Sequence, residues 1–168
     1  MSCRFITADG RATVALRDFS MSVARGEFVA VVGPTGCGKS TTLSLITGLL
    51  KPTLGEVRVM GQPVNGIDPR IGFVFQNPEH QFVAPTVREE LAYSLRGRSA
   101  AEVAERVDAM LERFDLTAHA TRHPFLLSGG QKRRLSVATA LIGGADVLVL
   151  DEPTYGQDRA RADELLRL

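Results

Sequence analysis

Residues 33–40 read GPTGCGKS, a glycine-rich turn that ends in a lysine and a serine. The stretch fits the pattern G-x-x-x-x-G-K-[S/T], in which glycines let successive backbone N–H groups converge on a phosphate. The helix expected to begin at Lys39 adds the partial positive charge of its N-terminus. Lys39 would bridge the β- and γ-phosphates of a nucleotide, and the Ser40 hydroxyl would ligate Mg²⁺. The alternative is a flexible glycine turn without a ligand.

Two carboxylates follow the apolar run VLVL, at Asp151 and Glu152. At the end of a strand, one carboxylate can hold Mg²⁺ through water, and its neighbour can orient or deprotonate the attacking water. Taken alone, a strand that ends in Asp-Glu is more often a solvated turn. Together with the glycine-rich loop, the pair predicts a nucleoside triphosphatase of the P-loop class.

A second candidate anion site lies in LLSGGQKRR, residues 126–134. Ser128 and Gln131 fit a capping box, so a helix should begin here with two glycines in its first turn. Exposed N–H groups and the Ser128 hydroxyl would stabilise negative charge at small steric cost. A capping box without a ligand is the alternative. The basic residues Lys132, Arg133 and Arg134 are expected to form a solvated or salt-bridged helix face rather than to contact phosphate.

The elements that must position these residues alternate between strands and helices. Apolar runs or alternation predict strands at 19–23, 28–32, 56–60, 71–75 and 146–150. A helix should run from Lys39 to about Leu50 and end at the Lys51-Pro52 pair.

Further helices should begin at capping residues Thr86, Ser99 and Ser128, and the last of them should end at Gly143-Gly144. The helix after Ser99 carries an apolar stripe that is expected to pack against a neighbouring helix: Val103, Val107, Met110, Leu111 and Phe114. A final helix is expected in residues 159–168.

Composition excludes several other classes of protein. The 168 residues are 44% hydrophobic and 23% charged, with a net charge of +1, so no strong field favours nucleic acid or an anionic surface. The longest apolar runs fall far short of the roughly 20 residues that a spanning helix needs. Cys3 and Cys37 are expected to be free thiols.

The motifs, in their order along the chain, closely resemble those of the ATP-binding-cassette (ABC) ATPases: Gly33–Ser40, Gln76, Leu127–Gln131, Asp151–Glu152 and Asp158. The resemblance implies an α/β fold with a P-loop NTPase core of mostly parallel sheet and flanking helices, an N-terminal antiparallel β part and a helical subdomain. It implies one ABC-type domain over 1–168, with the core at 1–76 and 141–168 and the helical signature subdomain at 77–140.

The resemblance implies that Gln76 is the family's hinge glutamine. The segment FVFQNPEHQFVAPTVREELAYSL resembles the ATPases of energy-coupling-factor and cobalt-type importers, in which an Asn-Pro and a Gln-Phe follow that glutamine. In that group two ATPases sit beneath a shared transmembrane coupling protein, and the cargo is a vitamin or a transition-metal ion. The resemblance implies an ATP-hydrolysing importer subunit, peripheral to the cytoplasmic face of the membrane. The alternatives are a module that binds ATP and dimerises without turnover, or a soluble ABC ATPase without a transport role.

The resemblance also implies a role for each motif. ABC ATPases work as head-to-tail pairs, so the Ser128–Gln131 turn would contact a γ-phosphate held by another subunit. Glu152 would be the general base, aided by Gln76 and Lys39, and Ser40, Gln76 and Asp151 would hold Mg²⁺. The residues implied to bind ATP are Gly33, Pro34, Thr35, Gly36, Cys37, Gly38, Lys39, Ser40, Thr41, Ser128, Gly129, Gly130 and Gln131.

Three departures from the family pattern stand out. Thr7 occupies the position where an aromatic residue usually stacks on adenine, and Phe5 is the only aromatic residue nearby. Tyr155 and Gln157 replace small and aliphatic residues, which favours an asymmetric pair. All histidines, His80, His119 and His123, precede Asp151, so the family's later switch histidine is expected to be missing together with the final strands. All three are expected in surface or loop positions.

Overall fold

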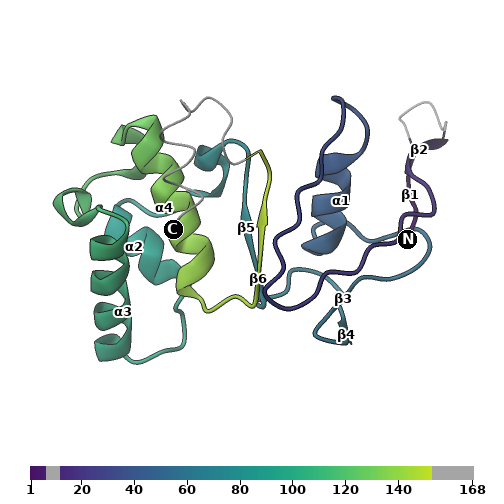
Figure 1. Ribbon diagram of the computed structural model, residues 1–168. Coiled ribbons are helices and arrows are strands. Elements are labelled where there is room, and N and C mark those ends of the chain that lie inside the picture. Colours follow the sequence, from purple (N-terminus) through teal and green to yellow (C-terminus); the bar gives the residue numbers. More distant parts are fainter. Residues whose placement is uncertain (7–11, 153–168) are drawn as a thin grey trace. The chain divides into compact units, whose positions relative to one another are not determined.

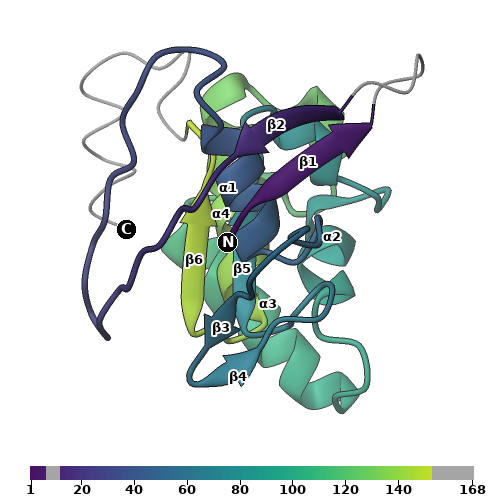
Figure 2. The ribbon, with the colours of Figure 1, turned by 90° about the vertical axis from the view of Figure 1, so that its right-hand side faces the viewer.

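The structure is a computed structural model that describes residues 1–6 and 12–152. The chain divides into two compact units, Met1–Asp68 and Pro69–Leu168, called here the N-terminal and C-terminal units. Figures 1 and 2 show the elements of both units in two views related by 90°.

The N-terminal unit contains two antiparallel strand pairs and one helix. Strands β1 (Cys3–Ile6) and β2 (Ala12–Leu16) pair with Arg4 opposite Val14. Strands β3 (Arg58–Val59) and β4 (Gln62–Pro63) form a two-residue hairpin, so only the middle of the strand expected at 56–60 is formed. The β1–β2 pair agrees with the antiparallel β part expected at the N-terminus.

Helix α1 runs over Lys39–Ile46 and ends about one turn earlier than expected. Gly48, two residues beyond, has a φ of 75°, a left-handed conformation that a helix cannot continue through. A Cβ at this position would lie 1.9 Å from the carbonyl oxygen of Gly66. The glycine therefore ends α1 before the Lys51-Pro52 pair is reached.

The strands expected at 19–23 and 28–32 are not formed in the described structure. The second segment is extended and exposed, with Phe28 76% and Val32 90% accessible. An apolar run becomes a strand only where a neighbouring strand takes up its backbone hydrogen bonds. In the described N-terminal unit β1 pairs with β2 and β3 with β4, and none of them pairs with this segment. The prediction from the apolar run alone was therefore wrong for the local structure.

The C-terminal unit is built on a parallel strand pair. Strands β5 (Ile71–Val74) and β6 (Val147–Leu150) pair in register, with Ile71 opposite Val147 and Val74 opposite Leu150. The backbone N–H of Asp151 continues the ladder by donating to the Val74 carbonyl at 3.0 Å. Both strands were predicted to within one residue at each end. Figure 1 shows the pair beside helix α4, which packs on β5.

Three α-helices and three short 3₁₀ turns connect β5 to β6. The helices are α2 (Val87–Tyr93), α3 (Ala100–Arg113) and α4 (Gly129–Ile142), and the turns are η1 (Pro78–Gln81), η2 (Thr117–His119) and η3 (Pro124–Leu126). The side chains of Thr86, Ser99 and Ser128 each accept a hydrogen bond from the third backbone N–H of the helix they begin. All three predicted helix starts are thus confirmed.

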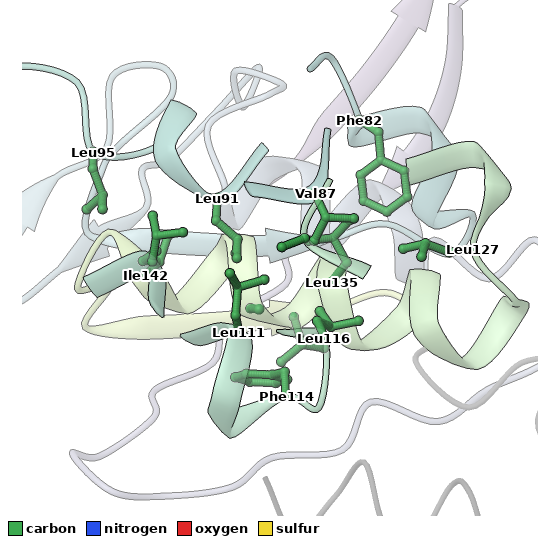
Figure 3. Packing of buried hydrophobic residues seen from close by; sticks show 14 of the residues in the cluster. Phe82, Val87, Leu91, Leu95, Leu111, Phe114, Leu116, Leu127, Leu135 and Ile142 are labelled. Carbon is green, nitrogen blue, oxygen red and sulfur yellow. The ribbon is translucent and has the colours of Figure 1, made fainter. Parts of the chain in front are cut away.

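The helices bury one continuous apolar cluster together with β5, shown in Figure 3. Val107, Leu111 and Phe114 of α3 lie within it, and Val103 and Met110 pack against its edge, so the predicted stripe is confirmed. The other buried members are Val74, Phe82, Val87, Leu91, Leu95, Leu116, Ala120, Leu127, Leu135, Val137, Ala138 and Ile142.

Candidate functional site

The glycine-rich loop leads directly into α1, whose N-cap is Gly38. Gly38 has a φ of 96°, and a Cβ there would lie 2.9 Å from the carbonyl oxygen of Ala15. The position therefore requires glycine. The Lys39 ammonium folds over the loop and donates to the carbonyls of Gly33 at 2.8 Å and Pro34 at 3.0 Å. The loop thus holds the ammonium over its own backbone, at the N-terminus of a helix.

The other residues of the loop 33–40 differ in contacts and exposure. The Cys37 backbone N–H donates to the Pro34 carbonyl at 3.3 Å, and the Cys37 thiol is free. Cys3 is also a free thiol, so the prediction of two unpaired cysteines is confirmed. Of the predicted loop residues, Pro34, Thr35, Gly36, Cys37 and Ser40 are exposed, whereas Gly33, Gly38, Lys39 and Thr41 are partly buried.

In the C-terminal unit, Gln76 and Glu152 lie beyond the carboxyl ends of neighbouring parallel strands. Gln76 Nε2 donates to Glu152 Oε2 at 2.9 Å, although the two residues are 76 positions apart. Asp151, at the end of β6, is partly buried. Glu152 has a φ of 46°, an uncommon left-handed conformation for a residue with a side chain. Such conformations persist where the surrounding structure holds them in place.

Arg133 contradicts the prediction of a solvated or salt-bridged basic face. Only 3% of the residue is accessible, and its guanidinium donates to the carbonyls of Phe75 at 2.7 Å, Gln76 at 2.8 Å and Glu152 at 3.4 Å. Burial lowers the pKa of the Arg133 guanidinium, because the charged form loses hydration. The physical reason for the error is that Arg133 lies one turn before Val137 on the inward face of α4.

The other two basic residues behave as predicted. Lys132 forms an ion pair with Glu79, and Arg134 forms one with Asp115 at 3.3 Å. The spacing to buried Val137 was the signal that could have separated Arg133 from its neighbours.

The N-terminus of α4 is closed by the predicted capping box. Gln131 N–H donates to Ser128 Oγ at 3.4 Å, and Ser128 N–H donates to Gln131 Oε1 at 2.9 Å. Gln131 Nε2 also lies 2.8 Å from His119 Nε2. Since the Gln131 oxygen already accepts from Ser128, its amide group is the donor to the ring nitrogen. This contact of His119 was not expected from the sequence, which indicated only a surface or loop position.

The two glycines of that turn face open space within the described structure. Apart from the adjacent residues and the backbone of α4 itself, no described heavy atom lies within 4 Å of a Cβ built on Gly129 or Gly130, and neither residue has a positive φ. The fold of the described chain therefore does not require glycine at either position, in contrast to Gly38. A larger side chain would obstruct only something that approaches from outside this part of the chain.

The structure brings some predicted residues together and leaves others in separate units. Gln76, Glu152 and Arg133 are in contact within the C-terminal unit, and Ser128–Gln131 begin the helix that carries Arg133. The loop 33–40 belongs to the N-terminal unit. Phe5, on β1, is 39% accessible. Thr7, Tyr155, Gln157, Asp158 and the helix expected at 159–168 lie outside the described residues.

His80 and His123 are exposed, in agreement with the predicted surface or loop positions. His80 is in η1, with Nε2 at 3.4 Å from the amide nitrogen of Asn77, and His123 Nδ1 accepts from the Phe125 N–H at 3.2 Å. The described residues contain no group of three or more His, Cys, Asp or Glu side chains placed to share a metal ion. Nor does the described part of the chain include a helix of the length and apolar character that membrane crossing requires.

Comparison with known proteins identifies relatives along most of the chain. The family described as ABC transporter matches residues 16–155. A candidate HMP/thiamine import ATP-binding protein of Bacillus subtilis is 46% identical over 90% of this chain and 28% of its own length. An energy-coupling factor transporter ATP-binding protein of Methanothermobacter thermautotrophicus is 43% identical over 93% of this chain and 53% of its own length. This chain thus spans about half the length of the second relative and less than a third of the length of the first.

Solved structures share the fold. A dimeric ATP-binding cassette in a post-hydrolysis state, bound to ADP and phosphate, matches with a TM-score of 0.84 and 31% identity over 99% of this chain and 77% of that chain. This likeness confirms the predicted α/β fold class of a P-loop NTPase core with a helical part.

Proposed function

This chain belongs to the ABC transporter family, and on that premise we propose that it binds and hydrolyses ATP as a subunit of an energy-coupling-factor-type importer. The observation that carries the proposal is the Gln76–Glu152 contact of 2.9 Å beyond the ends of β5 and β6. A carboxylate and an amide that meet at the carboxyl edge of parallel strands can together position and deprotonate a water molecule.

Each site residue has a proposed role. Glu152 is the general base, and Gln76 orients the attacking water. Lys39 and the backbone amides of 33–41 bind the phosphates of ATP, since the loop offers an ammonium and a helix N-terminus. Ser40, Gln76 and Asp151 would hold Mg²⁺, because all three supply the oxygen ligands that this ion prefers. When bound, Mg²⁺ would neutralise charge on the β- and γ-phosphates.

The Ser128–Gln131 turn, called here the signature turn, is proposed to act on a second subunit. Glycines 129 and 130 face open space, so their small size suits the close approach of a phosphate from outside the described chain. The capping box holds Ser128 and Gln131 at the positive end of α4. A similar cassette at 31% identity is dimeric. We therefore propose a head-to-tail pair in which the Ser128–Gln131 turn contacts ATP held by the partner.

The proposed domain division keeps 1–76 and 141–168 as the core and 77–140 as the helical signature subdomain. The position of α2, α3 and most of α4 along the chain supports it, because these helices connect the two strands of the parallel pair β5–β6.

The proposed partners are a second ATPase and a transmembrane coupling protein, which would hold this chain on the cytoplasmic face of the membrane. Nucleic acid is not a proposed partner. The Bacillus relative's name suggests HMP or thiamine as a cargo to test.

The experiment is a steady-state ATPase assay on the protein and on Glu152→Gln, with nucleotide binding measured in parallel. Loss of the general base should lower kcat by about 10²–10⁴-fold while ATP binding persists. Lys39→Ala should weaken ATP binding as well, which separates the two roles. Equal rates for the wild type and Glu152→Gln would overturn the assignment of Glu152. ATP binding without any wild-type turnover would instead identify a nucleotide-dependent binding module.

A further inference from the structure

Arg133 is a buried cation whose described acceptors are three backbone carbonyls. They belong to Phe75, Gln76 and Glu152, at 2.7, 2.8 and 3.4 Å. The two nearest basic neighbours on α4, Lys132 and Arg134, pair instead with the carboxylates of Glu79 and Asp115. Burial of a guanidinium without a carboxylate in contact is costly, and an apolar residue of similar size would pack at lower cost.

The benefit of an arginine here is its geometry. A guanidinium is a rigid planar fork, so its two terminal nitrogens can bind two separate segments at fixed spacing. Nη1 binds the carbonyl of Phe75, whereas Nη2 binds those of Gln76 and Glu152. One side chain thus fixes the backbone just after β5 and just after β6.

The two backbones held in this way carry the proposed hydrolytic pair. The Gln76 and Glu152 side chains are hydrogen-bonded to each other at 2.9 Å, and Glu152 has its unusual φ of 46°. Arg133 itself lies in the second turn of α4, five residues after Ser128. The helix start and the hydrolytic pair are therefore joined through a single side chain.

We propose that Arg133 is a positioning residue that locks the Gln76–Glu152 pair to the N-terminal turn of α4. The inference rests on the proposed function and deepens it. In a head-to-tail pair, the Ser128–Gln131 turn contacts the partner's ATP while Gln76 and Glu152 act on the chain's own ATP. Arg133 then makes the geometry of one site depend on occupancy of the other.

The test compares Arg133→Lys and Arg133→Ala with the wild type, in the protein assembled with its transport partners. Lysine keeps the charge but replaces the fork by a single ammonium, so it cannot hold both segments in the same geometry. We expect kcat to fall about 10²-fold in both variants, because small misplacements of reacting groups cost that much. The KM for ATP should change by less than about twofold, since the phosphate loop is untouched.

A purely structural role would not produce the expected rescue. Guanidinium at about 20 mM, far below denaturing concentrations, should restore part of kcat in Arg133→Ala and none in Arg133→Lys, whose ammonium fills the site. Cooperativity between the two ATP sites should also fall in both variants. The matched control is Arg88→Ala, which removes an exposed ion pair with Asp108 between α2 and α3 and should leave kcat unchanged.

The outcomes separate this inference from the proposed function. Wild-type turnover with an unchanged kcat in folded Arg133→Ala would overturn the role of Arg133 alone. A wild-type kcat in Arg133→Lys would do the same if Arg133→Ala fails to fold. A loss of kcat that follows the loss of thermal stability, without guanidinium rescue, would reduce Arg133 to a packing residue. A wild type that binds ATP without measurable turnover would instead overturn the proposed function.

Discussion

The two glycine-rich helix starts of this molecule look alike in sequence and differ in what their glycines are for. At the start of α1, Gly38 has a φ of 96° and a Cβ would meet the Ala15 carbonyl at 2.9 Å, so the fold itself requires glycine. At the start of α4, Gly129 and Gly130 have helical backbones and open space around them. The first turn takes its shape from contacts within its own chain, whereas the second is free of such contacts, which suits the proposed approach of a phosphate from a second subunit.

The surroundings of the two helices differ as well. α4 packs into the large apolar cluster of the C-terminal unit through Leu135, Val137 and Ala138. α1 buries Leu45 and Thr42, and neither residue belongs to that cluster. Packing into a large cluster suits a turn that is proposed to present its amides to another molecule, whereas Lys39 at the start of α1 is held by backbone carbonyls of the loop 33–40.

The largest effect is expected from opening a cavity in the packing of each helix. Leu135→Ala in α4 should lower the free energy of unfolding by about 2–5 kcal/mol, because it opens a cavity in a closely packed cluster. The loss for Leu45→Ala in α1 should fall toward the lower end of that range, since Leu45 lies outside the large apolar cluster. Both leucines are at most 1% accessible, so urea unfolding of the pair is a matched comparison. Equal losses would show that the two helices are equally well supported.

Gly130→Ala should separate activity from stability. Alanine favours a helix over glycine by roughly 0.5–1 kcal/mol, so thermal stability should rise. The ATPase rate should fall by about 10²-fold, because a methyl group now obstructs the amides that meet the phosphate. Gly143→Ala, at the other end of α4, is the control that should leave the rate unchanged. A Gly130→Ala protein with full activity would contradict the trans-acting role of the turn.

Gly38→Ala should change stability in the opposite direction. Both the left-handed backbone and the contact with the Ala15 carbonyl are strained by a side chain, at a cost of about 1–2 kcal/mol. ATP affinity should fall as well, because the loop must shift to relieve the contact. Calorimetry of both variants should show a lower thermal stability for Gly38→Ala and a higher one for Gly130→Ala. An increase in stability for Gly38→Ala would contradict the conclusion that the fold requires glycine at this position.

The smallest expected effects come from the capping serines. Ser99→Ala and Ser128→Ala should each cost about 1 kcal/mol of stability, because each removes a side-chain hydrogen bond at a helix start. Only Ser128→Ala should also lower the ATPase rate, since Ser99 caps α3 and touches no proposed site residue. The ratio of rate loss to stability loss in the two variants measures how far Ser128 acts beyond capping. Equal ratios in the two variants would show that Ser128 acts only as a helix cap.

Features that depend on neighbouring residues were predictable from the sequence. The capping residues Thr86, Ser99 and Ser128, the strands at 71–74 and 147–150, and the apolar stripe of α3 were all predictable, because backbone hydrogen bonding and periodicity act over a few residues. The glycine loop and the signature turn were recognisable for the same reason.

The remaining features depend on contacts between residues far apart in the sequence. The apolar run at 28–32 was not enough to form a strand, since a strand needs a partner that lies elsewhere in the chain. The Gln76–Glu152 contact spans 76 positions, and the Arg133 contacts span up to 58. Packing of α4 on β5 turns Arg133 inward, where loss of hydration makes its carbonyl partners necessary. Local pattern therefore indicated the proposed site residues, and long-range packing set the contacts among Gln76, Glu152 and Arg133.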